Sequence, residues 1–344
     1  MHAALDAAGQ VWPAFVLVTG LLLVGVVAER DGLFEAAGAG IARLPVDGRV
    51  LFLTALGLVA IVTAILNLDT SVFFLTPVLL HVARARGLAE APFLYGAVFM
   101  SNSASLFLPG SNLTNLIVLH GAPVTGRVFL GHMLPAALAA VAVTALYLLV
   151  AFGSGLRRTT PSDWQRRPVQ IGLGAIAVAA SAALVLALSN PAGPVLAVGV
   201  VAVAVSRVSH TRVFETIDVR VLAGLFLLAV ALGALGRLWG GPASFVDGLG
   251  VWATAGASAI ASVAVNNLPA AVLLTPHPPQ RPDALLVGLN LGPNLAVSGS
   301  LSALLWLRVA RVLGASPSAR TYSLLGLGLV PLSIGASVAA LVWL

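Results

Sequence analysis

The chain has 344 residues, of which 59% are apolar and only 9% are charged, and its mean hydropathy is +1.02. Soluble proteins carry about a quarter charged residues, so this composition excludes a soluble globular domain. The net charge of +6 comes from 18 Arg residues and no Lys, and the lack of Cys excludes disulfides, thiolate metal sites and Cys nucleophiles. The chain is therefore predicted to be an all-α polytopic membrane protein.

Apolar runs of the length that crosses a bilayer, about 17–25 residues, alternate with polar breaks along the chain. Four runs are interrupted by residues that end helices, and we expect these to be re-entrant hairpins or broken helices. The predicted elements, in order, are a span at 11–28, an interfacial segment at 33–43, a hairpin at 50–83 whose second arm (71–83) is too short to cross, a broken helix at 92–119, a span at 128–152, a polar loop at 153–168, spans at 169–189, 192–206 and 219–239, a hairpin at 248–276, a broken helix at 284–306 and a last span at 322–344.

The polar breaks occur twice at matching positions. Interrupted apolar segments in corresponding positions of two halves point to the binding site of a secondary transporter. We therefore predict an inverted repeat, in which 1–152 is the first half, 153–168 is a cytoplasmic loop and 169–344 is the second half, with a helix pair at 169–206 that the first half lacks. The matches are NLDTSVFFLTP (67–77) with NNLPAAVLLTP (266–276) at an offset of 199, and Asn102 and SNLTNL (111–116) with Asn290 and GSLSAL (299–304) at an offset of 188.

The distribution of the Arg residues predicts how this arrangement is oriented in the membrane. If each hairpin enters and leaves on one face, eight crossings remain and 15 of the 18 Arg residues lie in loops on one side. Loops rich in Arg stay in the cytoplasm, so we expect a multi-pass inner (plasma) membrane protein with both termini outside, embedded in lipid and without a nucleic acid partner. An odd number of crossings separates the two halves, so their orientations are opposite.

Backbone breaks at membrane depth leave polar groups without helical partners, and they persist only where they are buried in protein or line a wet cavity. Half-helix N-termini and Asn, Ser and Thr side chains at such breaks can bind a hydroxylated or anionic solute, or a cation. The alternative, which the sequence leaves open, is that the breaks are ordinary kinks in a packed bundle.

Asp69 is the one acidic residue in the middle of an apolar region. A carboxylate near the membrane centre costs roughly 2.5–3.5 kcal/mol on insertion scales, so its presence points to a role such as proton coupling. The other interpretation is an N-cap for the helix that follows, and one residue can do both. Leu268 occupies the matching position of the second repeat, so the proton site is expected in the first half alone.

Other classes of function lack their residues. The chain has no HExxH, GxSxG or Walker A motif and no paired intramembrane Asp residues, so we predict no enzyme, no metal site and no cofactor. A channel would also use broken helices, and flux assays would separate it from a carrier. Arg30 and Arg237 are interpreted as interfacial anchors, with a gating or solute-attracting role as the alternative.

Several motifs resemble the arsenite/antimonite efflux carrier family, within the ion transporter superfamily that includes sodium–dicarboxylate carriers. The resemblance covers nearly the whole chain. Two departures fall at the breaks, since Leu68 separates an Asn and an Asp that are adjacent in the family, and Asn294 stands where the family is usually basic. The motifs are NLDTSVFFLTPV (67–78), SNSASLFLPGSNLTNLI (101–117), VNNLPAAVLL (265–274), LGPNLAVSGSLSALLWLRV (291–309) and DGLFE (31–35).

The resemblance implies proton-driven export of arsenite or antimonite, sometimes with a separate ATPase subunit, and a homodimer is a candidate assembly. A sodium- or proton-coupled carrier of a small organic or inorganic anion is the alternative. The family motifs imply a binding site lined by Asn67, Asp69, Ser111, Asn112, Asn115, Asn267, Asn294, Ser300 and Ser302, to which the breaks add Thr70, Asn102 and Asn266.

Overall fold

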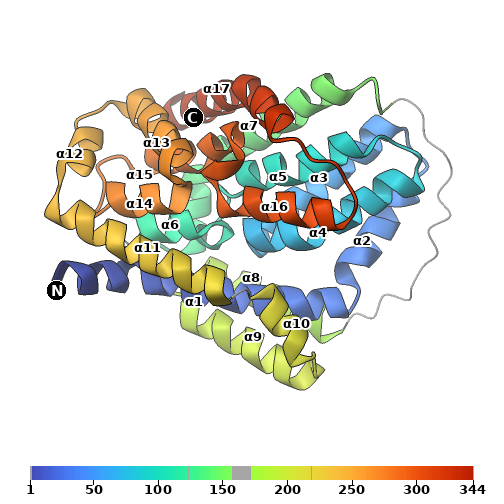
Figure 1. Ribbon diagram of the computed structural model, residues 1–344, viewed down its shortest axis with the longest axis horizontal. Coiled ribbons are helices and arrows are strands. Elements are labelled where there is room, and N and C mark those ends of the chain that lie inside the picture. The colour runs from blue at the N-terminus through green and yellow to red at the C-terminus, as the bar shows by residue number, and fades with distance from the viewer. Residues whose placement is uncertain (1, 123, 157–171, 218, 344) are drawn as a thin grey trace.

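The computed structural model describes residues 2–122, 124–156, 172–217 and 219–343, and within these ranges all regular structure is helical. Among the described residues, six helices are long and apolar enough to cross a membrane, which confirms an all-α polytopic fold. The helices form an elongated bundle with most axes along its length (Figure 1). Most of the predicted loop at 153–168, from 157 onward, and the start of the predicted span at 169–189 lie outside the described residues.

The helices follow one order twice: a long helix, a short helix, a hairpin, a broken helix and a long helix. The first half has α1 (His2–Arg30), α2 (Leu33–Ala42), α3 (Gly48–Ile65), α4 (Leu68–Ala85), α5 (Glu90–Ala104), η1 (Pro109–Ser111), α6 (Leu113–Val118) and α7 (Gly126–Phe152). The second half has α11 (Val219–Leu238), α12 (Gly241–Asp247), α13 (Val251–Val265), α14 (Asn267–Leu274), α15 (Pro282–Leu291), η2 (Gly292–Leu295), η3 (Val297–Gly299), α16 (Leu301–Val312) and α17 (Ala319–Trp343). Between them lie α8 (Leu173–Ala187), α9 (Ala192–Ser206) and α10 (His210–Thr216).

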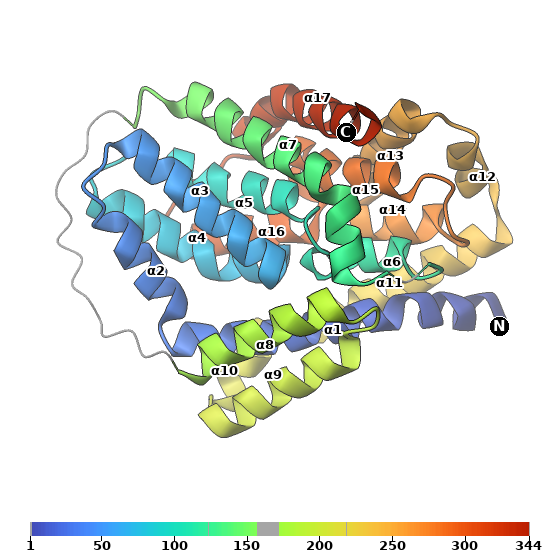
Figure 2. The ribbon, with the colours of Figure 1, turned by 180° about the vertical axis from the view of Figure 1, so that it is seen from behind.

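The two halves run in opposite directions. The α3–α4 hairpin occupies one end of the bundle and the α13–α14 hairpin the other, as both views show (Figures 1 and 2). The hairpin of each half packs against the broken helix of the other, since α4 contacts α16 and α14 contacts α6. The long helices pair between halves as well, α1 with α11 and α7 with α17. Each half therefore completes the other, and neither has a core of its own.

The ends of the bundle differ in charge. The connections α2–α3, α4–α5 and α16–α17 lie at one end (Figure 1), which we call the Arg-rich end. The opposite end, called the Arg-poor end, holds the connections α6–α7 and α14–α15 (Figure 1). Arg127 lies in the first turn of α7, Arg237 in the last turn of α11 and Arg281 directly before α15. Four of the 15 Arg residues predicted on one side, at 157, 158, 166 and 167, lie outside the described residues, and the side of the membrane that each end faces stays a prediction.

The second arm of the first hairpin differs from its prediction. Residues 71–83 were expected to be too short to cross, but α4 is an 18-residue helix whose length and composition would allow a crossing. The extension arises because the Asn67 side chain caps the backbone N–H of Thr70, which brings the polar residues after it into the helix. Two further short helices, α10 and α12, fall in segments for which no helix was predicted.

The start of α3 and the end of α4 nevertheless both lie at the Arg-rich end. The guanidinium of Arg86, which follows α4, donates to the carbonyl oxygens of Ala42 and Leu44 at 2.8 Å and of Val46 at 2.9 Å. These carbonyls lie in the segment that leads into α3, so the start of one arm is tied to the end of the other. The chain therefore returns to the end from which it came, as a re-entrant hairpin does.

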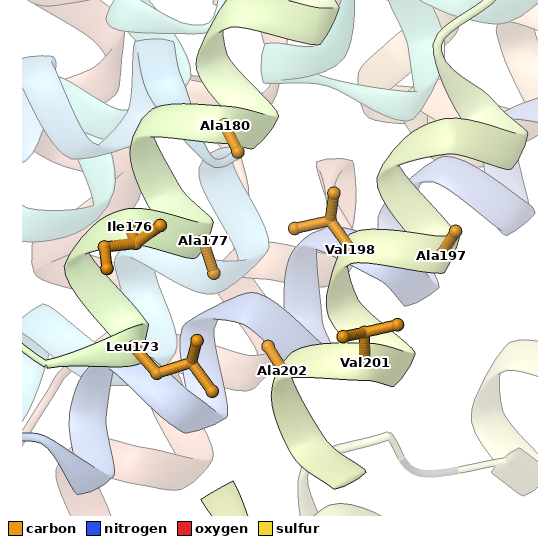
Figure 3. Close-up of a pocket in the computed structure, with 8 residues that line it drawn as sticks. All are labelled: Leu173, Ile176, Ala177, Ala180, Ala197, Val198, Val201 and Ala202. Atoms are coloured by element: carbon orange, nitrogen blue, oxygen red, sulfur yellow. The ribbon is translucent and has the colours of Figure 1, made fainter. Parts of the chain in front are cut away.

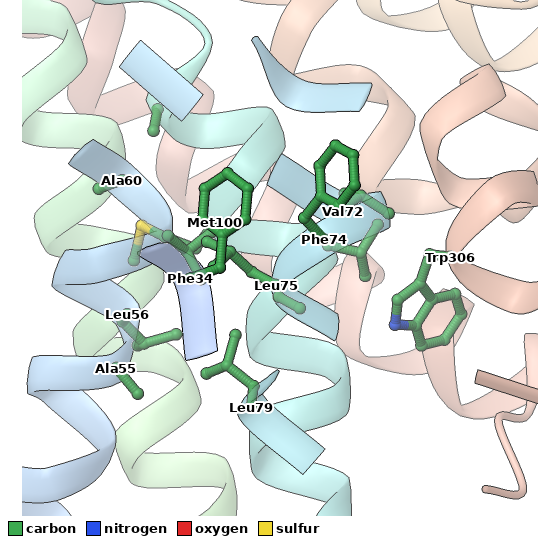
Figure 4. Packing of buried hydrophobic residues seen from close by; sticks show 14 of the residues in the cluster. Phe34, Ala55, Leu56, Ala60, Val72, Phe74, Leu75, Leu79, Met100 and Trp306 are labelled. Atoms are coloured by element: carbon green, nitrogen blue, oxygen red, sulfur yellow. The ribbon is translucent and has the colours of Figure 1, made fainter. Parts of the chain in front are cut away.

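The first hairpin is held by a continuous apolar core (Figure 4). Leu56 of α3, Leu75 of α4 and Met100 of α5 are at most 1% exposed and belong to one cluster. Phe34 of α2 and Trp306 of α16 join the same cluster, so it spans both halves. Within a bilayer, such a core is held by close van der Waals packing rather than by transfer of apolar surface from water.

The second hairpin is held by close backbone approach instead. Gly288 of α15 and Gly292 at the start of η2 face small residues of α13 that include Ser258 and Ser262. A Cβ on either glycine would collide with the α13 backbone and with these hydroxyls. This seam of small residues lets α13 and α15 pack at a distance that larger side chains would prevent.

The helix pair α8–α9, which lies outside the repeat, packs on α1 and leaves an apolar groove between its two helices (Figure 3). The groove is chemically similar to lipid tails and offers a polar solute no hydrogen bonds. It is therefore not a candidate for the solute site. Its lining residues are Leu173, Ile176, Ala177, Ala180, Ala197, Val198, Val201 and Ala202.

We expect Gly288→Ala to destabilise the protein by about 1–3 kcal/mol, because the added methyl group has no space in the α13–α15 seam. Gly256→Ala on α13 is the matched control, since a Cβ there meets no atom within 4 Å. Thermal unfolding of the purified variants in detergent measures the difference. Equal melting temperatures for the two variants would contradict the packing of this seam.

Candidate functional site

The breaks of the two broken helices meet between the halves. The Asn102 Nδ2 group, near the end of α5, donates to Asn294 Oδ1 of η2 at 2.8 Å. The Asn294 Nδ2 group in turn donates to the Phe99 carbonyl of α5 at 3.5 Å. Asn102 and Asn294 are at most 1% exposed, so this amide pair is a buried polar joint between the first and the second half.

A second joint is centred on Asn290 of α15, which is fully buried. Its Oδ1 accepts from Ser105 Oγ at 2.7 Å and from Asn112 Nδ2 at 2.5 Å. Its Nδ2 donates to Asn115 Oδ1 at 2.8 Å and to the Leu286 carbonyl at 2.9 Å. All donors and acceptors of this amide are therefore satisfied, three of its bonds cross to the first half, and its role is to join the halves.

The hairpin tips use the same cap in both halves. Asn67 caps α4 through its bond from Thr70 N (2.7 Å), and Asn266 caps α14 through a bond from Leu268 N (3.4 Å). Asn266 adopts φ 77° and ψ 147°, a backbone region that residues other than glycine rarely occupy. Its Nδ2 donates to the Ser298 carbonyl of η3 at 3.0 Å, which ties the tip to the neighbouring break.

The second parts of the broken helices also begin with matched caps. Asn112 caps α6 by accepting from Thr114 N at 3.1 Å, and Ser300 caps α16 by accepting from Ala303 N at 3.1 Å. Both helices thus start between the halves and direct the positive end of their dipoles at the breaks. Ser111 donates to the Ala64 carbonyl at 3.0 Å, so the first break is also fastened to the first hairpin.

Asp69 lies in the first turn of α4 and is 7% exposed. Its Oδ1 accepts from Ser302 Oγ of α16 at 2.6 Å, so this contact too joins the two halves. Among the described residues, no basic side chain makes an ion pair with this carboxylate. A buried carboxylate without a cation is costly when it is charged.

Four buried atoms at these breaks have no hydrogen-bond partner: Asn67 Nδ2, Thr70 Oγ1, Asn102 Oδ1 and Thr114 Oγ1. Buried polar groups are nearly always paired, so such atoms need an explanation, and a bound solute or water would supply it. The side chain of Asn267, which is 5% exposed at the second tip, also makes no hydrogen bond within the described residues.

The structure thus brings some of the predicted site residues into contact across elements and leaves others with contacts only in their own helix. Five pairs or groups cross between elements: Asp69 with Ser302, Asn102 with Asn294, Asn112 and Asn115 with Asn290, Asn266 with Ser298, and Ser111 with Ala64. Ser300 only caps its own helix, and Asn67 and Thr70 contact each other through the cap. The sequence-based site omitted Asn290 and Ser105, although the repeat alignment of Asn290 with Asn102 was the signal that could have found the former.

Comparison with known proteins agrees with this architecture. The sequence model of the CitMHS family, described as citrate transporters, matches residues 4–278. An arsenical pump membrane protein of Escherichia coli (strain K12) is 24% identical over 337 residues, which cover 87% of this chain and 79% of that protein. The arsenical pump membrane protein of Yersinia enterocolitica is 25% identical over 343 residues, with the same coverage.

Two further similarities are more distant or shorter. The silicon efflux transporter LSI3 of Oryza sativa subsp. japonica is 29% identical over 140 residues, which cover 41% of this chain and 29% of that protein. The crystal structure of the Alcanivorax borkumensis YdaH transporter, described as having an unusual topology, superposes with a TM-score of 0.62 at 17% identity. It covers 99% of this chain and 87% of that one, and it supports the fold alone.

Replacing Asn290 tests the joint between the halves. Asn290→Leu leaves Asn112 Nδ2 and Asn115 Oδ1 without the amide that pairs them, and each unpaired buried group costs about 1–3 kcal/mol. We expect a marked fall in the melting temperature of the purified protein. Asn190→Leu, in the exposed connection between α8 and α9, serves as the control. If both variants melt like the parent, Asn290 is not a structural joint.

Proposed function

The chain belongs to the CitMHS family of membrane transporters, and from this premise we propose that it exports arsenite or antimonite across the inner membrane in exchange for protons. The family consists of transporters rather than enzymes. The observation that carries the choice of solute is the chemistry of the breaks between the two halves. They offer amide and hydroxyl groups and one carboxylate, and none of the side chains that hydrogen-bond there is basic.

An uncharged solute suits such a site better than an anion does. Arsenite is mainly a neutral trihydroxide at neutral pH, so it can donate to amide oxygens and accept from amide nitrogens and hydroxyls. The unpartnered atoms Asn67 Nδ2, Thr70 Oγ1 and Asn102 Oδ1 provide one donor, one hydroxyl and one acceptor. We propose these three, with Asn267, as direct contacts, while the other predicted residues hold the site in shape.

Asp69 is the proposed proton carrier. It is the acidic group among the site residues, and its partner Ser302 is neutral, so it can be uncharged with a proton or charged without one. Binding of a proton at Asp69 would change the charge of the site by one unit next to the proposed contacts Asn67 and Thr70. That is a direct way to couple proton influx to solute release.

The alternative is a sodium- or proton-coupled carrier of a small anion. The family description as citrate transporters and the N-termini of α6 and α16, which point at the breaks, favour it. Sodium-dependent uptake of a di- or tricarboxylate would support this reading. An ATPase subunit, a homodimer and the placement of both termini outside remain predictions.

Arsenite transport can be measured directly. Inside-out vesicles from cells that express the chain and lack their own pump should accumulate arsenite when the vesicle lumen is made more acidic than the medium. Export from the cell corresponds to uptake by these vesicles. The same cells should tolerate more arsenite in growth assays. No accumulation and no tolerance, with the protein confirmed in the membrane, would reject this solute, and citrate tested in parallel would address the alternative.

Asp69→Asn should abolish the response of arsenite accumulation to the proton gradient while the protein still inserts, because the amide keeps the shape of the carboxyl group but cannot carry the proton. Glu90→Gln is the matched control. Its carboxylate pairs with Arg84 at 2.7 Å on the exposed surface, where such pairs contribute little. A proton-driven response in Asp69→Asn equal to that of the control would assign coupling to another group.

A further inference from the structure

Gln10 is a buried polar residue on α1 that lies far from the breaks in sequence and has no part in the site described above. It is 3% exposed within an apolar helix. Its Nε2 donates to the Ile117 carbonyl at 3.2 Å, to the Thr275 carbonyl at 2.8 Å and to Thr275 Oγ1 at 3.1 Å. One side chain therefore contacts both α6 of the first half and the C-cap of α14 in the second half.

Arg237 of α11 holds this side chain in place. Its Nη2 donates to Gln10 Oε1 at 2.9 Å, and its Nη1 donates to the Gly233 carbonyl at 3.1 Å. The sequence reading of Arg237 as a snorkelling anchor misses this contact. Because Oε1 is occupied by the guanidinium, the amide is oriented with its Nε2 toward Ile117 and Thr275. We call Gln10, Arg237, Ile117 and Thr275 the Gln10 clasp.

The two helices that the clasp joins, α6 and α14, each begin at one of the breaks that form the proposed site. The helix α6 begins at the Asn112 cap and ends near Ile117, and α14 begins at the Asn266 cap and ends before Thr275. They contact each other along their length. With six and eight residues, neither is long enough to be stable alone, so their position depends on tertiary contacts.

The opposite end of the molecule has a weaker counterpart. There α4 and α16 form the matching pair, and Arg84 of α4 donates through Nη2 to the Leu313 carbonyl at the end of α16, at 3.2 Å. The Arg84 side chain is 46% exposed, whereas Gln10 is 3% exposed. Hydrogen bonds shielded from water are stronger than exposed ones, so of these two links the one between α6 and α14 is the stronger.

We propose that Gln10, oriented by Arg237, is a positioning residue that holds α6 against α14 and so closes the site toward the Arg-poor end. Opening on that side then requires these hydrogen bonds to break, and their strength sets the balance between the closed and open states. The proposal rests on the chain being a transporter and not on the identity of its solute.

The natural absence of Cys allows a direct test by thiol labelling. Ala271→Cys, at a fully buried position of α14, reports opening between the helices, and Ala122→Cys, exposed at the same end, reports which side of the membrane this end faces. A membrane-impermeant maleimide is applied to right-side-out and to inside-out vesicles of the full chain. Labelling rates of Ala271→Cys are then compared with and without Gln10→Leu.

Gln10→Leu should accelerate labelling of Ala271→Cys about tenfold, since the variant loses the hydrogen bonds that hold α6 against α14 in the closed state. The increase should appear only from the side that labels Ala122→Cys. Thr19→Val is the control on the same helix, because Thr19 Oγ1 bonds only to the Phe15 carbonyl of its own turn, and it should leave the rate unchanged.

Two further variants keep the test decisive if Gln10→Leu fails to fold. Gln10→Glu keeps an acceptor for Arg237 but cannot donate to Ile117 and Thr275, and Arg237→Met removes the group that orients the amide. Both should accelerate labelling from the same side. Unchanged rates in a folded variant, or an equal increase from both sides of the membrane, would overturn the proposal.

Discussion

The structure depends on how an apolar bundle pairs the polar groups of its own broken helices. Four chain breaks expose backbone N–H and C=O groups where no water from a bilayer could reach them. Side-chain amides and hydroxyls of the same half supply most of the partners, while bonds between side chains cross from one half to the other. The Asn102–Asn294 pair and the Asn290 network are therefore both the structural link between the halves and the frame of the proposed site.

The same requirement explains where the symmetry between the halves fails. Matched caps at Asn67 and Asn266, and at Asn112 and Ser300, serve the backbone, which is alike in both halves. Asp69 and the unpartnered atoms of Asn67 and Asn102 lie in the first half, whereas the second half supplies the proposed contact Asn267 and has Leu268 at the position that matches Asp69. The two halves are thus alike where side chains hydrogen-bond the backbone, and they differ at the residues that are proposed to bind the proton and the solute.

The all-α fold and the interruptions of its apolar runs could be predicted because each depends on local sequence, whereas the cap considered at Asp69 lies at Asn67 instead. The length of α4 could not, since a side-chain cap at Asn67 outweighs the polarity of the residues that follow it. The role of Asn290 and the whole Gln10 clasp depend on contacts between segments more than 100 residues apart, which no local pattern encodes. The solute was suggested by resemblance, and the chemistry of the breaks supports that suggestion.

The central claim is that the two breaks meet inside the protein. A protease site inserted in the predicted loop at 153–168 and the Cys pair Asn102→Cys and Asn294→Cys test it in the otherwise Cys-free chain. After treatment with a short bifunctional thiol reagent and cleavage, the two fragments should remain joined on a denaturing gel, and the control pair Asn102→Cys with Asn190→Cys should separate. Separation of the fragments in both cases would contradict the account.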